Sequence, residues 1–134
     1  MARIKHIAIR TPDPEKTAAF YKKVFGLEEV GLARSGFYLS DGYINLAILK
    51  SNDDGTGENA REVPGYAGID HLGFQVENLE EITRVLEEEG ATATNQRIDM
   101  IHGEGTDAKS YYELKYRGPD SQIIDVTESG WIGT

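Results

Sequence analysis

The stretch Ile4-Lys5-His6-Ile7-Ala8-Ile9-Arg10 decides the fold, because the same pattern returns in the other half of the chain as Ile69-Asp70-His71-Leu72-Gly73-Phe74-Gln75. Alternate side chains of an extended strand point to opposite faces of its sheet. In both copies, the large apolar side chains that follow the histidine share one face, while the histidine and a very small residue share the other. The repeat predicts a duplicated unit in which two histidine-bearing strands form two walls of one pocket.

Length and composition favour a single globular domain. At 134 residues the chain is long enough to bury a core but short for two independently stable halves, so we predict one domain over residues 1–134. No apolar run reaches the roughly 20 residues that a membrane helix needs, and the N-terminus lacks the apolar segment of a signal peptide. We therefore expect a cytoplasmic protein.

The net charge of the chain disfavours two classes of binding partner. The formal net charge is −9 at pH 7, which disfavours nucleic acid and anionic membranes, because both bind proteins through basic patches. The sequence contains no cysteine, so any bound metal must be held by nitrogen and oxygen ligands. A small-molecule substrate is the expected partner.

The first half of the chain, residues 1 to about 50, has the pattern of one βαβββ module. A strand at about 3–10 precedes a helix for which Asp13 is a good N-cap. Gly26 is placed to end this helix in a left-handed conformation. Three further strands are predicted at about residues 28–34, 36–40 and 43–50.

A second module follows a linker and repeats the same plan. The linker covers residues 51 to about 68 and is rich in Asn, Asp, Gly, Glu and Pro. The second module covers about 69–128, with a helix capped by Asn78 and a glycine-rich loop at 100–109. Residues 129–134 form a short tail. The strands of this module are predicted at about residues 69–76, 91–97, 111–117 and 122–127.

The last predicted strand carries a carboxylate on the side of the two histidines. When the closing strands of the two modules are aligned through their turns, one face is fully apolar in both, and Asp125 lies on the other face. If the apolar faces pack on the helices, Asp125 points to the same concave side as His6 and His71. An isolated carboxylate buried in a strand is costly, and a bound metal ion would offset that cost.

These features resemble the vicinal-oxygen-chelate superfamily. The resemblance rests on the tandem βαβββ plan, on one histidine in the first strand of each module, and on the closing sequence Gly118-Pro119-Asp120-Ser121-Gln122-Ile123-Ile124-Asp125. The superfamily includes glyoxalase I, methylmalonyl-CoA epimerase, extradiol dioxygenases, and the fosfomycin- and bleomycin-resistance proteins. The resemblance implies an α+β fold in which the two modules form a curved mixed sheet around a concave cup for a metal and a ligand.

The resemblance also implies a ligand set for a divalent metal ion. The histidine positions of the superfamily fall on His6 and His71, and the acidic position of the second module falls on Asp125. The fourth position falls on Ala47, where glyoxalases and epimerases usually have Glu or Gln, and Asn45 lies one pleat away. Two histidines and one carboxylate leave positions open on an octahedral ion, for two neighbouring substrate oxygens. Fe2+, Mn2+, Ni2+, Co2+ and Zn2+ are the candidate ions.

The other candidate residues each have a functional and a purely structural interpretation. Glu113 is a candidate catalytic base beside the metal, although an acid that faces solvent is the more frequent situation. His102, in the glycine-rich loop, lies either on the surface or at the mouth of the pocket. Trp131, in the tail, is expected to cover a hydrophobic edge.

Three functions are compatible with the resemblance. The first is a metal-dependent lyase or isomerase of the glyoxalase and epimerase type, acting on a small molecule that chelates the metal through neighbouring oxygens. The second is an extradiol-type ring-cleaving dioxygenase, which the set of two histidines and one carboxylate favours. The third is a non-catalytic small-molecule binding or antibiotic-resistance protein. The superfamily also implies a homodimer, and its modules pair either within one chain or between two.

Overall fold

The structure is a computed structural model that describes residues 1–52, 63–102 and 109–134, apart from the side chains of residues 95–112. Within these ranges the chain forms two helices and eight strands. In chain order the elements are β1 (Arg3–Thr11), α1 (Pro14–Phe25), β2 (Glu28–Ala33), β3 (Gly36–Ser40), β4 (Asn45–Lys50), β5 (Gly68–Gln75), α2 (Leu79–Glu88), β6 (Thr92–His102), β7 (Lys109–Arg117) and β8 (Ile123–Thr127).

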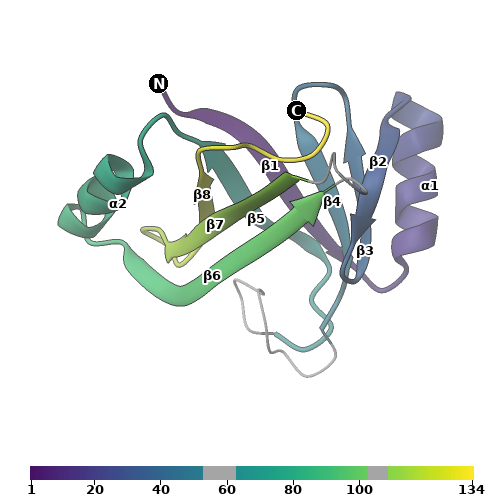
Figure 1. The fold of residues 1–134 in the computed structure, drawn as a ribbon. Coiled ribbons are helices and arrows are strands. Elements are labelled where there is room, and N and C mark those ends of the chain that lie inside the picture. Colours follow the sequence, from purple (N-terminus) through teal and green to yellow (C-terminus); the bar gives the residue numbers. More distant parts are fainter. Residues whose placement is uncertain (53–62, 103–108) are drawn as a thin grey trace.

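The described strands form one curved mixed sheet in the order β2-β3-β4-β1-β5-β8-β7-β6. Each half of this order comes from one βαβββ unit, with its first strand at the centre of the sheet (Figure 1). Within each unit the first and last strands are parallel, as β1 is to β4 and β5 is to β8, while the other pairs are antiparallel. The predicted α+β fold of tandem modules around a concave surface is confirmed.

The two modules join through antiparallel pairing of β1 with β5, both from the same chain. This register places His6 opposite Gly73 and Ala8 opposite His71. Directly opposed residues of neighbouring strands lie on the same face of a sheet, so both histidines face the concave side. The parallel neighbour β8 adds Asp125 to this face, because Asp125 pairs with Gly73.

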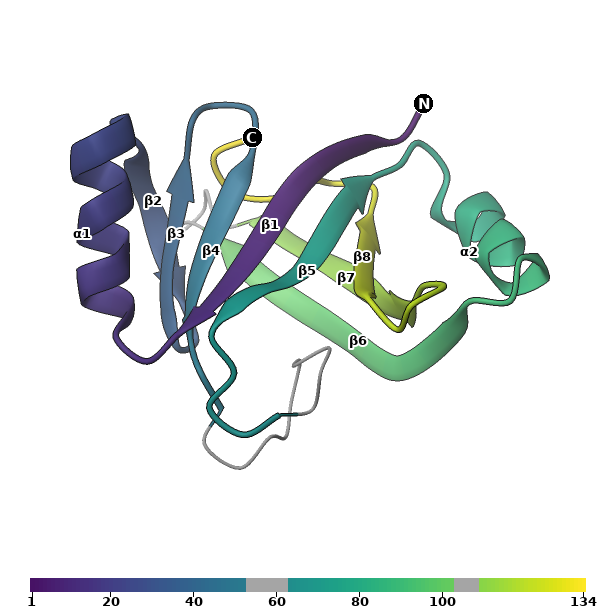
Figure 2. The ribbon, with the colours of Figure 1, turned by 180° about the vertical axis from the view of Figure 1, so that it is seen from behind.

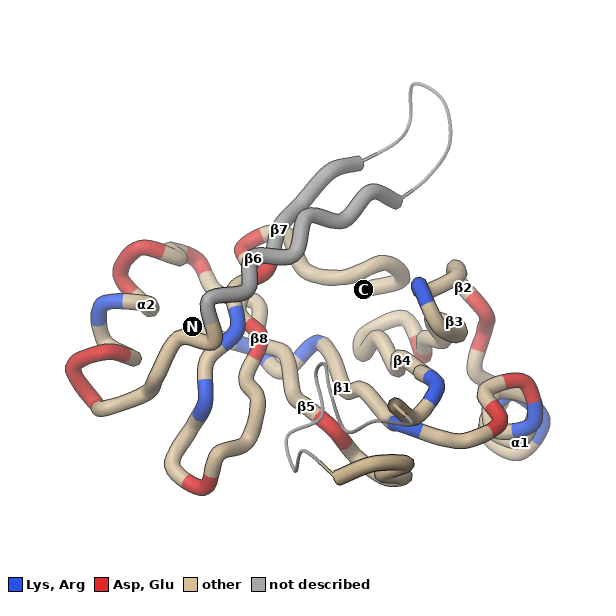
Figure 3. The backbone as a smooth tube through the Cα atoms, turned by 90° about the horizontal axis from the view of Figure 1, so that it is seen from below, with Lys and Arg blue, Asp and Glu red and all other residues tan. Residues whose placement is uncertain are grey.

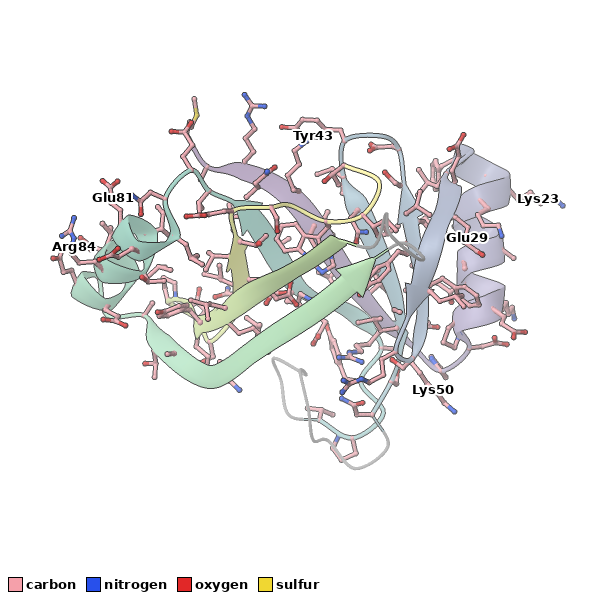
Figure 4. The ribbon with its side chains drawn as sticks, in the orientation of Figure 1. Lys23, Glu29, Tyr43, Lys50, Glu81 and Arg84 are labelled. Carbon is pink, nitrogen blue, oxygen red and sulfur yellow. The ribbon has the colours of Figure 1, made fainter. Side chains whose placement is uncertain are left out.

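The helices cover the outer surface of the sheet at its two ends (Figure 2). Helix α1 starts at its predicted cap, where the Asp13 side chain accepts a hydrogen bond from the Lys16 amide, and Gly26 ends it with φ = 70°. Its partners in one apolar core are Leu39, Leu46 and Ile48. Helix α2 covers a second core, and the charged side chains labelled on both helices point away from the sheet (Figure 4). In the described residues, neither helix is long and apolar enough to cross a membrane.

The glycine-rich loop predicted at residues 100–109 is shorter in the structure. Strand β6 continues to His102 and β7 begins at Lys109, where the two residues pair. The prediction was wrong at both ends because the antiparallel ladder of β6 and β7 continues beyond the apolar pattern that marked the strands. His102 therefore ends a strand, and its side chain lies outside the described residues, as do residues 103–108.

The C-terminal segment, residues 130–134, lies on the concave side of the sheet rather than at its edge (Figure 3). Ile132 packs against a buried cluster formed by Ala8, Tyr38 and Ala47. The hydroxyl of Ser40 donates a hydrogen bond of 2.7 Å to the carbonyl of Gly133. This segment covers the inner surface of the first module, so the sheet is packed on both of its faces there.

Candidate metal centre

Three of the predicted site residues meet on the concave face. His6 on β1, His71 on β5 and Asp125 on β8 each offer a ligand atom, and these atoms lie within 4.8 Å of one another. The Nε2 atoms of the two histidines are 3.2 Å apart, and Nε2 of His71 is 3.2 Å from Oδ2 of Asp125. All three side chains are buried. The strand repeat thus brings together groups that are distant in sequence.

Asn45 fixes the orientation of the His6 ring. Its amide nitrogen donates a hydrogen bond to the carbonyl of Ile132 at 2.9 Å, which turns its oxygen toward His6. That oxygen lies 2.8 Å from Nδ1 of His6. Because an amide oxygen can only accept, Nδ1 of His6 carries the hydrogen, and Nε2 presents a lone pair toward His71. Asn45 therefore binds Nδ1 of His6, the nitrogen that does not face His71, and is not a substitute for the missing fourth ligand.

Asp70 orients the ring of His71 as Asn45 orients that of His6, through Nδ1. Its Oδ2 atom lies 3.0 Å from Nδ1 of His71 and 3.4 Å from Nε of Arg10. A buried carboxylate at this distance favours the tautomer in which Nδ1 of His71 carries the hydrogen. Arg10 also donates a hydrogen bond to the carbonyl of Lys50. The carboxylate of Asp70 therefore lies between two donors, Arg10 and His71. Both histidines therefore have their Nδ1 atoms engaged and their Nε2 atoms directed to the centre.

Three lone pairs converge as a result, two from imidazole nitrogens and one from a carboxylate. Among the described residues, Oδ2 of Asp125 is buried without a hydrogen-bond partner. Burial, the neighbouring His71 and the nearby Lys115 lower the pKa of His6 well below its ordinary value, and together they outweigh the opposing effect of Asn45. A neutral imidazole is the form that binds a metal. The donor set of two nitrogens and one oxygen fits a divalent transition-metal ion.

Asp125 is not the isolated carboxylate that the sequence suggested. Nζ of Lys115, on β7, donates a hydrogen bond of 2.6 Å to Oδ1 of Asp125 and lies 3.4 Å from Oε1 of Glu113. Lys115 is only 2% exposed, so its ammonium offsets part of the cost of burying the two carboxylates. The ion pair uses Oδ1 of Asp125 and leaves Oδ2 directed toward the histidines.

Glu113 and Trp131 also lie close to these residues. The buried position of Glu113 agrees with its interpretation as a residue beside the candidate ligands and not with that of an acid that faces solvent. Glu113 is 5% exposed and Trp131 is 4% exposed. The indole Nε1 of Trp131 donates a hydrogen bond of 3.0 Å to Oε2 of Glu113. The indole is also stacked on the imidazole of His6, with ring centroids 4.8 Å apart. The prediction that Trp131 covers a hydrophobic edge was therefore wrong, because the C-terminal segment turns inward across the concave face.

The fourth ligand position of the superfamily is occupied by apolar packing. Ala47 pairs with Ala8 on β1, just as Asp125 pairs with Gly73 on β5, which confirms that Ala47 is the counterpart of Asp125. The side chain of Ile132 packs on the cluster that contains Ala8 and Ala47. The first module therefore provides one candidate ligand, His6, and the described residues offer a set of three.

Comparison with protein families agrees with this geometry. The profile of the Glyoxalase/Bleomycin resistance protein/Dioxygenase superfamily matches residues 3–124. The chain belongs to this superfamily. The match covers most of both modules and two of the three candidate ligands, His6 and His71, while Asp125 lies one residue beyond its end. Comparison with curated protein sequences gives no match.

Solved structures with a similar fold include several enzymes. The 2,3-dioxygenase LapB from Pseudomonas sp. KL28 aligns with a TM-score of 0.68 and 23% identity, over 98% of this chain and 42% of that one. A methylmalonyl-CoA epimerase from Streptomyces coelicolor aligns with a TM-score of 0.63 and 19% identity, over 98% and 97% of the two chains. The Mn(II)-bound glyoxalase from Novosphingobium aromaticivorans aligns with a TM-score of 0.66 and 15% identity, over 95% of this chain and 40% of that one. At these identities the likeness concerns the fold.

Proposed function

We propose that this protein binds one divalent metal ion through Nε2 of His6, Nε2 of His71 and Oδ2 of Asp125. The observation that carries the proposal is the convergence of these atoms within 4.8 Å, with both Nδ1 atoms already engaged by Asn45 and Asp70. With hydrogen on both Nδ1 atoms, the facing Nε2 and Oδ2 atoms are buried acceptors, which are costly to leave without a positively charged or hydrogen-bonding partner. A divalent cation supplies that charge, and the superfamily membership of the chain agrees with it.

We further propose a lyase or isomerase reaction on a small molecule with two neighbouring oxygens. A bound divalent ion would act as a Lewis acid on those oxygens and would lower the pKa of an adjacent carbon acid. Glu113 is the proposed base, because it is a buried carboxylate that is not itself a proposed ligand, and it shares the ammonium of Lys115 with the proposed ligand Asp125. Trp131 and Lys115 hold its two oxygens, so the carboxylate has a fixed orientation for proton transfer.

Metal analysis tests the site directly. Protein purified without chelator or affinity metal should contain, or take up on reconstitution, about one Fe, Mn, Ni, Co or Zn per chain. The variants His6→Ala, His71→Ala and Asp125→Ala should lose this metal while circular dichroism shows that they remain folded. His102→Ala is the matched control, because it removes the third histidine of the chain and should keep the metal. Absence of metal uptake by the wild type would contradict the proposal.

A second candidate is a ring-cleaving dioxygenase, and the three-ligand set favours it specifically. Ala47 leaves the first module without the carboxylate or amide that glyoxalases and epimerases usually have there. Two histidines and one carboxylate with open positions are typical of non-heme Fe(II) oxygenases. Oxygen uptake by the Fe(II)-loaded protein with catechol, compared with hydrogen–deuterium exchange at the α-carbon of 2-oxo and 2-hydroxy acyl compounds, distinguishes the two reactions.

The proposed site is complete within one chain, since β1, β5 and β8 of the same chain provide all three ligands. We still expect a homodimer and a cytoplasmic location from the resemblance and the sequence. The homodimer can be tested by light scattering after size-exclusion chromatography. Dissociation into monomers that keep their metal would agree with a site that requires no residue of a second copy.

A further inference from the structure

The C-terminal segment, residues 130–134, is attached to the concave face by contacts along its length. Ser40 donates a hydrogen bond to the carbonyl of Gly133, and Asn45 donates one to the carbonyl of Ile132. The side chain of Ile132 fills the space above the small residues of β1 and β4. The segment ends in a short turn in which the Thr134 hydroxyl donates to the carbonyl of Trp131. Side chains of the first module therefore help to define its conformation.

Trp131 lies where a side chain at position 73 would otherwise be. A Cβ atom added to Gly73 would lie 2.6 Å from Cη2 of Trp131 and 2.7 Å from Cβ of His6. No real Cβ atom tolerates such contacts, so only glycine allows the indole to pack against β5 and His6. The small residue beside the second histidine therefore provides room for the C-terminal segment, and not an open wall for a ligand.

We propose that this segment is an integral part of the metal centre and that Trp131 is a positioning residue for His6 and Glu113. The inference rests on the proposed metal site. His6 is held on one edge by Asn45, at 2.8 Å, and on one face by the indole of Trp131. Asn45 binds both the imidazole and the backbone of the segment, so displacement of the segment releases both constraints on His6.

The same indole orients the proposed base. Its Nε1–H group donates to Oε2 of Glu113, while Lys115 lies near the other oxygen. Loss of the indole removes the hydrogen bond that holds Oε2 of Glu113, so the carboxylate loses one of the contacts that orient it. Removal of a group that orients a metal ligand typically lowers metal affinity or activity by about tenfold to a hundredfold. Trp131 acts on both groups at once through two different interactions, a ring stack and a hydrogen bond.

The single tryptophan of the chain provides a direct test in the metal-free protein. Its emission should be blue-shifted and protected from acrylamide, because the indole is buried. Nitrogen-15 spectra of the imidazole groups should show His6 as the tautomer with hydrogen on Nδ1. In Trp131→Ala the His6 resonances should shift and lose this defined state, while those of His71 should remain. An indole of the folded wild type that acrylamide reaches freely would overturn the proposal.

Metal binding provides the second test, with Co(II) as the probe. Trp131→Ala should weaken Co(II) binding about tenfold or more and change the visible spectrum of the bound ion. Trp131→Phe keeps a ring on His6 but lacks the hydrogen-bond donor, so it should restore both the affinity and the His6 resonances. Equal Co(II) affinity and unchanged His6 resonances in folded Trp131→Ala would also overturn the proposal. If the wild type binds no Co(II), the proposed metal site is contradicted. The acrylamide and imidazole measurements on the metal-free protein still test whether Trp131 packs on His6.

Discussion

The indole of Trp131 lies parallel to the imidazole of His6, with ring centroids 4.8 Å apart and an angle of 7° between the ring planes. One residue comes from β1 and the other from the C-terminal segment, so residues that are distant in the sequence meet at the candidate metal centre. From Trp131, contacts continue through Glu113, Lys115, Asp125 and His71 back to His6. These six residues form a closed ring of contacts.

Asp70→Asn should weaken metal binding, and it should also lower stability because it leaves the buried Arg10 without its charged partner. The carboxylate of Asp70 lies 3.0 Å from Nδ1 of His71, where its charge makes the opposite nitrogen a better donor to a metal. An asparagine keeps the shape but removes the charge. We expect a loss of about tenfold to a hundredfold in affinity for Co(II) or Mn(II), measured by isothermal titration calorimetry.

The control for this measurement is Asp120→Asn, which makes the same change at an exposed turn. Its affinity should match that of the wild type. A loss of affinity in both variants would indicate a general effect of net charge, and a loss in neither would show that Asp70 does not act on the metal through His71.

Lys115→Met should destabilise the metal-free protein strongly. Lys115 is almost completely buried and its Nζ is 2.6 Å from Oδ1 of Asp125. Removal of one partner of a buried ion pair typically costs about 3–5 kcal/mol, because the other charge remains buried. Urea unfolding in the presence of chelator measures this loss. Bound metal should restore more stability to the variant than it adds to the wild type, since the ion then provides the positive charge.

The double variant Lys115→Met/Asp125→Asn provides the control for this interpretation. If the loss comes from the unpaired carboxylate, then removal of its charge should recover part of the stability. Wild-type stability of Lys115→Met in chelator would contradict the role assigned to the pair.

The sequence predicts the two histidines and Asp125 because these residues depend on strand alternation and on the repeat. Strand alternation also places Glu113 and Lys115 on one face, opposite Leu114 and Tyr116, which pack in the core under α2. Alternation alone leaves open whether this face meets solvent or the candidate site, and in the structure both residues are buried. A strand pattern shows which residues share a face but not what covers it, and here the cover is a segment distant in sequence.

The position of Trp131 could not be predicted by the same reasoning. The C-terminal segment has no strand or helix periodicity, and its contacts with Ser40, Asn45 and Gly73 are all tertiary. Gly73 was a usable signal, because a glycine inside a strand often marks the close approach of another group. The repeat predicts that Gly73 belongs to a pocket wall, whereas in the structure the approaching group is the indole of Trp131.

Gly73→Ala should displace the indole and lower stability. The new methyl group would lie 2.6 Å from Trp131 and 2.7 Å from the Cβ of His6, and overpacking of this kind costs about 1–3 kcal/mol. The tryptophan emission should shift to longer wavelength. Gly31→Ala is a matched control on β2, because its added methyl would lie 3.2 Å from the flexible end of Ile132. An unchanged emission spectrum of Gly73→Ala would contradict the packing described for the indole.

The stability of the metal-free protein should fall as the pH drops below the ordinary titration range of histidine. Burial, together with His71 and Lys115, lowers the pKa of His6 in the folded state well below 6.5. Above 6.5 the imidazole is neutral in both states and stability is complete. Below 6.5 the unfolded chain binds a proton that the folded chain does not bind, so stability decreases until the lowered folded-state pKa is reached. For one group the slope is at most about 1.4 kcal/mol per pH unit.

Urea unfolding with chelator, at a series of pH values from about 7.5 to about 5.5, measures this dependence. His6→Gln retains a polar side chain but has no group that titrates in this range, so its stability should change less with pH than that of the wild type. The His102→Ala variant should keep the wild-type slope, because it leaves His6 in place. If the wild type and His6→Gln lose stability with the same slope, then His6 is not held neutral by the folded chain, and the lone pair that we assign to its Nε2 is not available to a metal.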